Sequence, residues 1–591
     1  MPKTRDEINE KYKWDISAMY ATDEVWEADF EQVRAAKDSV SALKGTLGES
    51  AEALYNCLKL RDELFMKTEN VYIFAHLKHD EDTTEPIYQA FSSRAVSLIT
   101  EVSAELSFIE PEILAIDKNK LSSYLDSYEP LGIYKHYIDD ILRLKEHTLS
   151  EEMENVLAKV SEIGQAASNI FSMLNNADLK FGTIKDENGS EKELTHGSYM
   201  GFMESRDRNV RKAAFTGLYK AYIDHKNTLA ESYAASVRND VFFAAQRKYK
   251  SCLEASLSRN NIPTSVYHNL IEAVNANLPS LHKYMETRKK ILGLGELHMY
   301  DIYVPLVEDI DNHIDYNKAI ETIIKSLAPL GPDYVEALKT GLDKRWVDIY
   351  ENKGKKSGAY SWGSYLSYPY ILMNYDNKVN DMFTLTHELG HSMQSYFTRG
   401  NQPFVYGDYT IFTAEVSSTV NEALLMEHLL NTEKDESMKR YLINYYIEQF
   451  RATVFRQTMF AEFELKAHEI IEAGEALTSQ SMNQMYRELN EKYFGKTVVL
   501  DEEIDYEWSR IPHFYSPFYV YQYATGYAAA IALSRKILDG DVEGYLKFLK
   551  SGSSMYSIEQ LKMAGVDMNG PEAVNMALDT FGKLVEEFGR L

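Results

Sequence analysis

The amino-acid sequence predicts a mainly α protein with only short β segments. Residues from about 24 to 116 form long amphipathic runs with few Gly or Pro, and residues 438–473 repeat this pattern. Apolar residues that recur every three to four positions are typical of helices with one buried face. Hydrophobic residues make up 45% and charged residues 26% of the chain, an ordinary profile for a soluble globular protein. At 591 residues, several smaller units and a single two-lobed helical body fit the length equally well.

The first strand signal follows the N-terminal run of helices. Residues 178–184 alternate between polar and apolar side chains, and Asn188-Gly189 supplies a tight turn after them. We therefore predict a hairpin near 178–194. Because helical patterning resumes directly afterwards, we place a boundary there. It divides the chain into an N-terminal helical region, 1–199, and a second domain, 200–591.

A second strand-rich patch spans residues 346–375 and is interrupted by a basic, turn-like stretch at 352–358. An extended peptide can bind at the edge of a sheet through backbone hydrogen bonds. The backbone of Gly358 and Ala359 is a candidate for such binding. A purely structural hairpin explains the same pattern equally well.

The most informative segment follows this patch. His387-Glu388-Leu389-Gly390-His391 matches H-E-x-x-H and lies among apolar residues at helical spacing. Histidines four residues apart lie on one helical face, so both imidazoles can reach one metal ion. Glu388 lies beside them as a candidate general base, and the small Gly390 would permit close approach of a backbone or a substrate. Two histidines in an ordinary helix are the alternative, which the buried apolar stripe disfavours.

A catalytic zinc site needs a third protein ligand and an open position. A second helix is predicted over 412–425, and Glu415, 24 residues after His391, can return across the first helix. Its carboxylate would complete a His₂Glu set for one Zn²⁺ ion per chain. Glu422, two turns further along, fits two roles equally well: an acceptor for a ligating histidine, or a solvated helix charge.

Tyrosines are abundant, with 42 in the chain, and they concentrate after residue 505. Ser516-Pro517 predicts a helix start, with His513 in the preceding loop. A Tyr hydroxyl or a His N–H can stabilise the oxyanion that forms when a peptide bond is hydrolysed. On a helix Tyr519 and Tyr523 share one side and Tyr521 points elsewhere, so at least one of the three is a core residue.

Composition excludes several classes of partner. The formal net charge of −27 argues against binding to nucleic acids or to anionic membranes. The first residues lack a secretory apolar core, and the apolar stretch 528–533 is too short to span a bilayer. We therefore expect a cytoplasmic protein. Cys57 and Cys252 have no CxxC neighbours and are expected to be reduced core residues.

Together these segments resemble the M3 family of zinc metallopeptidases, the thimet oligopeptidase-like group, and specifically its oligoendopeptidase F branch. The resemblance is carried by residues 356–360, 384–391, 415–422, 511–515 and 518–526. It covers most of the chain by layout. It implies a two-lobed helical metallopeptidase with a deep substrate channel, a small β-sheet beside the zinc helix, and catalysis by the domain 200–591.

Carried over by position, the resemblance assigns individual roles. It implies that zinc is held by three ligands: His387, His391 and Glu415. It implies that Glu388 is the general base and that His513 stabilises the transition state. The family's Tyr-x-Tyr pair aligns with Tyr519-Val520-Tyr521, which makes Tyr521 the oxyanion candidate. The residues expected to contact substrate are Gly358, Ala359, Tyr360, Tyr519 and Tyr523.

The resemblance implies a zinc-dependent endopeptidase that cuts short oligopeptides, because a deep channel excludes folded proteins. Two alternatives remain open at this point. One is a dipeptidyl carboxypeptidase of the same family, which would need a cationic clamp for the substrate carboxylate. The other is a non-catalytic peptide-binding helical protein, against which the intact Glu388 argues.

Overall fold

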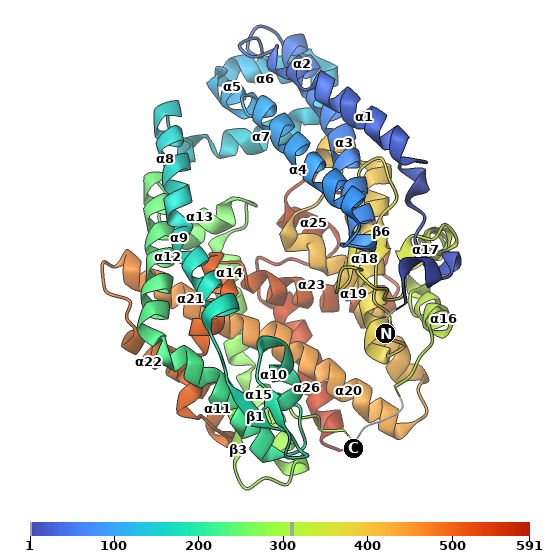
Figure 1. Ribbon diagram of the computed structural model, residues 1–591. Helices are drawn as coiled ribbons and strands as arrows, with labels where there is room; N and C mark the ends of the chain where they lie inside the picture. The colour runs from blue at the N-terminus through green and yellow to red at the C-terminus, as the bar shows by residue number, and fades with distance from the viewer. Residues whose placement is uncertain (1–2, 308–311, 591) are drawn as a thin grey trace. The chain divides into compact units, whose positions relative to one another are not determined.

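The computed structural model describes residues 3–307 and 312–590 and confirms the mainly α prediction (Figure 1). The strands are short, with two or three residues each. The chain forms two compact units, each assembled from three stretches of sequence. The first unit contains Met1–Lys145, Asp311–Leu429 and Leu533–Val566, and the second contains Glu146–Ile310, Leu430–Ala532 and Asp567–Leu591. The predicted boundary at residue 199/200 divides the chain once along the sequence, whereas each of these units combines three separate stretches. That boundary stays a prediction.

The first unit contains most of the N-terminal helices together with the H-E-x-x-H segment. Its helices are α1 (Asp23–Ala36), α2 (Asp38–Ser41), α3 (Ala51–Glu81), α4 (Pro86–Leu106), α5 (Ile109–Ala115), α6 (Lys118–Ser127), α7 (Lys135–Arg143), α16 (Tyr316–Ser326), α17 (Pro332–Asp343), α18 (Val379–Asn401), α24 (Glu543–Leu549), α25 (Ser557–Met563) and most of α19 (Ile411–Thr432), whose end from Leu430 onward belongs to the second unit. The longest of these helices is α3. Ser50 caps its N-terminus, because the Ser50 side chain accepts a hydrogen bond from the Ala53 N–H.

A three-stranded sheet completes the first unit, with strand order β4-β6-β5. β4 (Val347–Asp348) runs parallel to β6 (Tyr370–Leu372), and β5 (Tyr360–Trp362) pairs antiparallel with β6 on its other side. β5 is therefore an edge strand. Trp346, Tyr370 and Leu372 belong to the same buried cluster as the apolar residues of α1, α3 and α4. The N-terminal helices and the small sheet thus share one hydrophobic core, which positions the sheet rigidly.

The second unit is also helical. Its helices are α8 (Glu151–Gly164), α9 (Ala166–Met173), α10 (His196–Met203), α11 (Arg208–Asp224), α12 (Lys226–Gln246), α13 (Cys252–Ser258), α14 (Thr264–Ala276), α15 (Leu278–Ile291), α20 (Glu436–Phe450), α21 (Arg456–Glu472), α22 (Ser479–Phe494), α26 (Glu572–Phe588) and most of α23 (Tyr521–Leu538), whose end from Leu533 onward belongs to the first unit. β1 (Thr183–Lys185) and β2 (Glu191–Glu193) form an antiparallel hairpin where the sequence predicts one. β3 (Leu297–His298) and β7 (Val498–Val499) form a short parallel pair.

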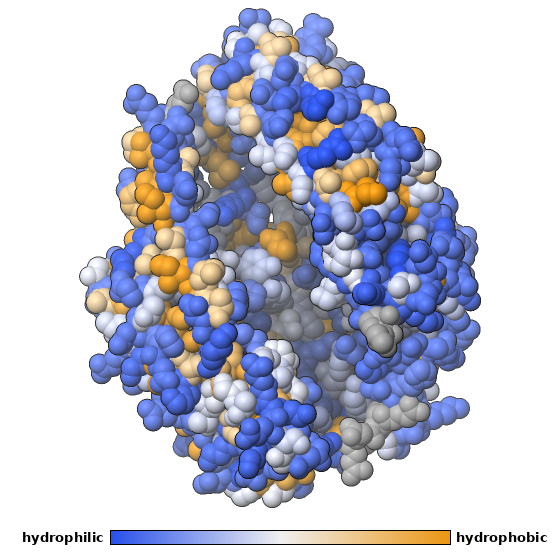
Figure 2. Space-filling view, in the orientation of Figure 1, coloured by the Kyte–Doolittle hydropathy of each residue, from blue (hydrophilic) through white to orange (hydrophobic). Residues whose placement is uncertain are grey.

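The surface of the second unit carries an apolar face over α8 and α9, on the left of Figure 2. Ile163 and Met173 are 74% and 63% exposed, and Ile170 is 53% exposed. Ile163 and Ile170 line a groove of about 810 Å³ between α8, α9 and α12. The packing of this unit therefore leaves part of the apolar stripe of α8 and α9 in contact with solvent.

Two further expectations concern the described residues. Cys57 and Cys252 are both free and buried, as predicted. Among residues 3–307 and 312–590, no helix is long and apolar enough to cross a membrane.

Candidate active site

The H-E-x-x-H segment lies in the middle of α18. Near the start of this helix, the Asp381 carboxylate accepts hydrogen bonds from the backbone N–H groups of Asp376 and Lys378, at 2.9 Å each. An acidic group at this position satisfies backbone donors that have no partner within the helix. Phe383, Leu385, Leu389 and Met393 are buried, so the apolar stripe seen in the sequence faces the core. This leaves the two histidines half-buried on another face.

Gly390 allows α19 to lie directly against α18 (Figure 1). A Cβ atom at Gly390 would lie 2.5 Å from Ser418 Cα and 2.7 Å from Ser417 O. No side chain fits in that space. The sequence suggested close approach of a backbone or a substrate at this glycine, and the structure shows a backbone. The close approach brings Glu415 on α19 opposite the histidines on α18.

The structure brings together the three residues expected to bind zinc. Glu415 Oε2 lies 3.2 Å from His387 Nε2 and 3.5 Å from His391 Nε2. The two Nε2 atoms are 3.2 Å apart. Within the described part of the chain, these side chains form the one group of three or more His, Cys, Asp or Glu residues with metal-ligand spacing.

The spacing of these three atoms fits a tetrahedral metal ion. A tetrahedron with ligand distances of about 2.0–2.1 Å has edges of about 3.3–3.4 Å, which is close to all three separations. Two imidazoles and one carboxylate also form a ligand set that zinc takes in hydrolytic enzymes. The residues present therefore suit a zinc ion in both geometry and donor chemistry.

Two neighbouring groups orient these side chains. Glu422 Oε1 lies 2.7 Å from His387 Nδ1, so this nitrogen can donate its proton to the carboxylate and leave Nε2 free to bind a metal. The Ser418 hydroxyl donates to Glu415 Oε2 at 3.1 Å. Sequence reasoning named Glu422 but not Ser418. Its position three residues after Glu415 on the same helical face is the signal that could have identified it.

The pKa values of the carboxyl groups differ because their surroundings differ. Burial raises the pKa of Glu388, and the neighbouring Glu415 and Glu422 charges add to this effect against the opposing charges of His387 and His391. Burial alone would also raise the pKa of Glu415, but hydrogen bonds with His387 and His391 outweigh it and hold that pKa well below the usual range. Glu388 thus binds a proton more readily than Glu415, which suits a base beside a ligand.

The proposed substrate strand lies next to α18. Asn374 Nδ2 donates to the carbonyl oxygens of Lys356 and Gly358, at 3.0 and 2.9 Å. The Tyr360 hydroxyl donates to Asp80 Oδ2 at 2.8 Å. In β5 itself, the Ser361 hydroxyl lies 2.8 Å from the hydroxyl of Ser392, which directly follows His391. The edge strand is therefore tied both to the helical core and to α18. This helix carries the two histidines of the candidate metal group, by which we mean His387, His391 and Glu415.

The other predicted residues lie in the second unit. His513 is exposed, and its Nε2 lies 3.5 Å from the Tyr523 hydroxyl. The His513 ring also stacks on Tyr519, with centroids 6.0 Å apart. Tyr521, in contrast, is 3% exposed, and its ring centre lies 5.1 Å from that of Tyr267. His513, Tyr519 and Tyr523 thus form one surface cluster, and Tyr521 lies in the interior beneath it.

The helix start predicted at Ser516-Pro517 is wrong. The chain forms a 3₁₀ helix over Pro512–Tyr515, and α23 begins only at Tyr521. Between them Phe518 adopts φ +55°, and its N–H donates to the buried carboxylate of Glu464 at 2.7 Å. This hydrogen bond and the left-handed backbone at Phe518 hold the segment away from a helical path, which local capping preferences do not predict.

Known proteins match this chain over its full length. The model of peptidase family M3 matches residues 201–580, and the model named Oligopeptidase F matches residues 112–181. Oligopeptidase PepF of Bacillus subtilis (strain 168) is 48% identical over 590 residues, which cover 99% of this chain and 88% of that protein. The crystal structure of oligoendopeptidase-F from Enterococcus faecium covers 96% of this chain and 99% of its own, with 39% identity and a TM-score of 0.74. A crystal structure of a protein from Chlamydophila abortus covers both chains completely, with 36% identity and a TM-score of 0.94.

Proposed function

Because this chain belongs to peptidase family M3, we propose that it is a zinc-dependent endopeptidase of the oligoendopeptidase F type, acting on short peptides. The observation that carries the proposal is the group of His387, His391 and Glu415 with Glu388 on the same helix. Membership of the family makes the protein a peptidase. The identity of the metal, the endopeptidase mode and the residue roles are our inference.

The reaction divides among the residues of the chain as follows. His387, His391 and Glu415 would hold one zinc ion, which supplies Lewis acidity at the scissile carbonyl and lowers the pKa of the attacking water when it is bound. Glu388 accepts the proton of that water and passes it to the leaving amine. Its raised pKa, which comes mainly from burial, makes it a stronger base than an exposed glutamate.

Edge strand β5 and the preceding Gly358 and Ala359 are our candidates for substrate binding. Among the described strands, β5 pairs only with β6, so a peptide can add a strand on its other side. The link between Ser361 and Ser392 would then bring that peptide close to the metal group. Side chains of the peptide would alternate in direction, and binding through the backbone would permit many sequences.

We further infer that His513 and a tyrosine assist the transition state by donating hydrogen bonds to the oxyanion. Tyr523 is a better candidate than Tyr521, because its hydroxyl lies beside His513 and Tyr521 is buried. This part of the proposal rests on the resemblance of the segment. Location in the cytoplasm stays a prediction from the acidic composition.

The test is the Glu388→Gln variant. It should keep one zinc ion per chain and lose roughly 10²–10⁴-fold in turnover of an end-blocked, internally quenched peptide. Glu69→Gln is the matched control: its amide oxygen can still accept from the Tyr365 N–H, as Glu69 Oε2 does at 3.0 Å in the wild type. Near-normal cleavage by Glu388→Gln would refute the assignment of the base.

The same substrate separates the proposal from its alternatives. A dipeptidyl carboxypeptidase requires a free C-terminal carboxylate, so it should leave the end-blocked peptide intact. A non-catalytic peptide-binding protein would bind stoichiometric zinc without hydrolysis that a chelator abolishes. Mass spectrometry of a peptide-library digest, with and without chelator, would also identify the preferred residues around the cleaved bond.

A further inference from the structure

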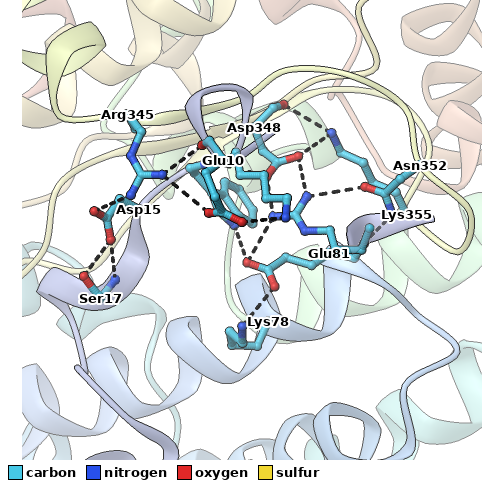
Figure 3. Close-up of polar contacts among 12 residues, drawn as sticks. Glu10, Asp15, Ser17, Lys78, Glu81, Arg345, Asp348, Asn352 and Lys355 are labelled. Carbon is cyan, nitrogen blue, oxygen red and sulfur yellow. Dashed lines mark hydrogen bonds and ion pairs between the residues drawn. The ribbon is translucent and has the colours of Figure 1, made fainter. Parts of the chain in front are cut away.

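A cluster of charged residues surrounds the end of strand β4 in the first unit (Figure 3). At its centre is Asp348, the last residue of β4, whose carboxylate accepts two parallel hydrogen bonds from the Arg5 guanidinium at 2.6 and 2.8 Å. Lys355 Nζ contacts the same carboxylate at 2.7 Å. The side chains of Asp348 and Lys355 are 1% and 0% exposed. Two cations thus neutralise one carboxylate that has almost no access to water.

Glu81 adds a second carboxylate to this cluster and pairs with two of its cations. Glu81 lies 3.4 Å from Arg5 and 3.0 Å from Lys78, and it accepts a hydrogen bond from the indole of Trp14 at 2.6 Å. The pKa of Asp348 is lowered: burial would raise it, but the hydrogen bonds and charges of Arg5 and Lys355 outweigh burial. Asp348 is therefore ionised at neutral pH, and the attraction between these charges persists there.

The cluster determines the path of the chain after β4. Lys355 Nζ donates to the carbonyl oxygens of Asp348 and Tyr350, at 3.2 and 2.7 Å, and so closes the segment 348–355 into a compact loop. Asn352 Nδ2 donates to the Glu81 carbonyl oxygen at 3.0 Å, at the end of α3. Arg5 connects the end of β4 to this loop, because its guanidinium bonds Asp348 and its Nη1 also contacts Asn352 Oδ1 at 3.4 Å.

The loop leads directly into the proposed substrate strand. Lys356 follows Lys355. Its backbone N–H donates to the Asp80 carbonyl oxygen at 3.1 Å, and its Nζ donates to Asp80 Oδ2 at 3.0 Å. Asp80 also accepts from the Tyr360 hydroxyl. β5 begins at Tyr360, and Ser361 contacts Ser392 on the helix of the metal group. A continuous set of contacts therefore extends from Arg5 to the zinc-binding helix through the strand.

We propose that Arg5 is a positioning residue for peptide hydrolysis. It holds the 352–362 segment in place, so that a peptide added to β5 binds beside the metal group. The inference rests on the proposed function. Arg5 touches neither metal ligands nor substrate, and it acts through Asp348 and Lys355.

The chemistry of the cluster supports a geometric role. A buried ion-pair cluster contributes little net stability relative to apolar side chains of similar volume, because the charges lose their hydration. What such a cluster does supply is direction: the guanidinium fork bonds a carboxylate in one orientation. Without the fork the 352–362 segment would have to be ordered by the incoming peptide, which weakens binding of substrate and transition state alike and therefore raises KM.

The experiment compares Arg5→Gln with Arg345→Gln. Arg345 is the matched control, because it also ties the N-terminal segment to the sheet, through the Glu10 carbonyl at 2.8 Å and Asp15 at 2.6 Å (Figure 3). It makes none of the contacts to Asp348 and Lys355 described above. In Arg5→Gln, Asp348 keeps Lys355 as its partner, so the buried carboxylate stays neutralised and the chain should fold.

With an end-blocked quenched peptide, we expect Arg5→Gln to raise KM by ~10- to 100-fold with kcat within about threefold, and Arg345→Gln to leave both within about twofold. A merely structural role would instead lower the active fraction, which reduces the apparent kcat and leaves KM unchanged. Hydrogen exchange of the 356–362 amides should accelerate in Arg5→Gln, with the amides of α18 unaffected.

Unchanged KM in Arg5→Gln, or equal losses in the two variants, would overturn the proposal. If Arg5→Gln does not fold, Arg5→Lys replaces it: a lysine keeps the charge without the fork and should raise KM by a smaller factor. If the wild type itself fails to cut the peptide, the proposed function fails. The exchange measurement then still decides whether Arg5 holds the strand.

Discussion

Replacement of Gly390 by alanine tests whether close packing of α18 against α19 forms the metal site. In an exposed helix this substitution would stabilise the helix by about 1 kcal/mol, because alanine loses less backbone entropy than glycine. Here the added Cβ would lie 2.5 Å from Ser418 Cα, and an ordinary contact requires at least 3.4 Å. The helices must therefore separate by about 0.9 Å, the difference of those distances.

This separation has two measurable consequences. Overpacking of a close contact typically costs about 1–3 kcal/mol, which exceeds the gain in helix propensity. Glu415 moves with α19, and zinc sites tolerate errors in ligand position of only about 0.2 Å. We therefore expect Gly390→Ala to lower the melting temperature and to weaken zinc binding by at least ~10-fold, the lower end of the effect of losing ligand orientation.

The assay is a chelator competition titration, followed by thermal unfolding of the zinc-free protein. Gly400→Ala is the control, because Gly400 lies in the same helix and an added Cβ meets nothing within 4 Å. That variant should melt at or above the wild-type temperature with unchanged zinc affinity. The reasoning is refuted if Gly390→Ala binds zinc like the wild type, because the ligands would then not depend on this helix contact.

Two further predictions concern single carboxylates. Glu422→Ala removes the acceptor 2.7 Å from His387 Nδ1, so zinc affinity should fall by ~10–100-fold in the same titration; unchanged affinity would identify Glu422 as a solvated helix charge. Burial raises the pKa of Glu464 to about 8, from 4.5 in the absence of burial. The folded state thus binds this proton more tightly, and its contribution to stability is complete below pH 4.5 and is lost as the pH rises through 8. Glu464→Gln should therefore melt at a higher temperature than the wild type at pH 8.5, with the difference vanishing near pH 4.5, and a constant difference across this range would contradict the raised pKa.

Local sequence periodicity was sufficient to predict that the fold is mainly helical and that the two histidines lie together. His387 and His391 share a face because four residues make about one helical turn, and this relation needs no tertiary contact. Glu415 was identified because one further helix can return across the first at that chain length. The hairpin at residues 183–193 followed from its Asn-Gly turn in the same way.

Tertiary contacts decided the rest. The start of α23 moved to Tyr521 because Phe518 bonds Glu464, more than fifty residues earlier in the chain. The tyrosine pattern predicted that at least one of Tyr519, Tyr521 and Tyr523 is a core residue, and burial against Tyr267 identifies Tyr521 as that residue.

The H-E-x-x-H pattern by itself determined that His387 and His391 lie on one face as candidate metal ligands, because the geometry of one helix specifies that face. It could not determine what holds the neighbouring elements in place. The backbone contact at Gly390 and the bond from Arg5 to Asp348, 343 residues away, join segments with no shared local pattern. Only packing of the whole unit brings such segments together, because their attraction acts through space and leaves no periodic signal in the sequence.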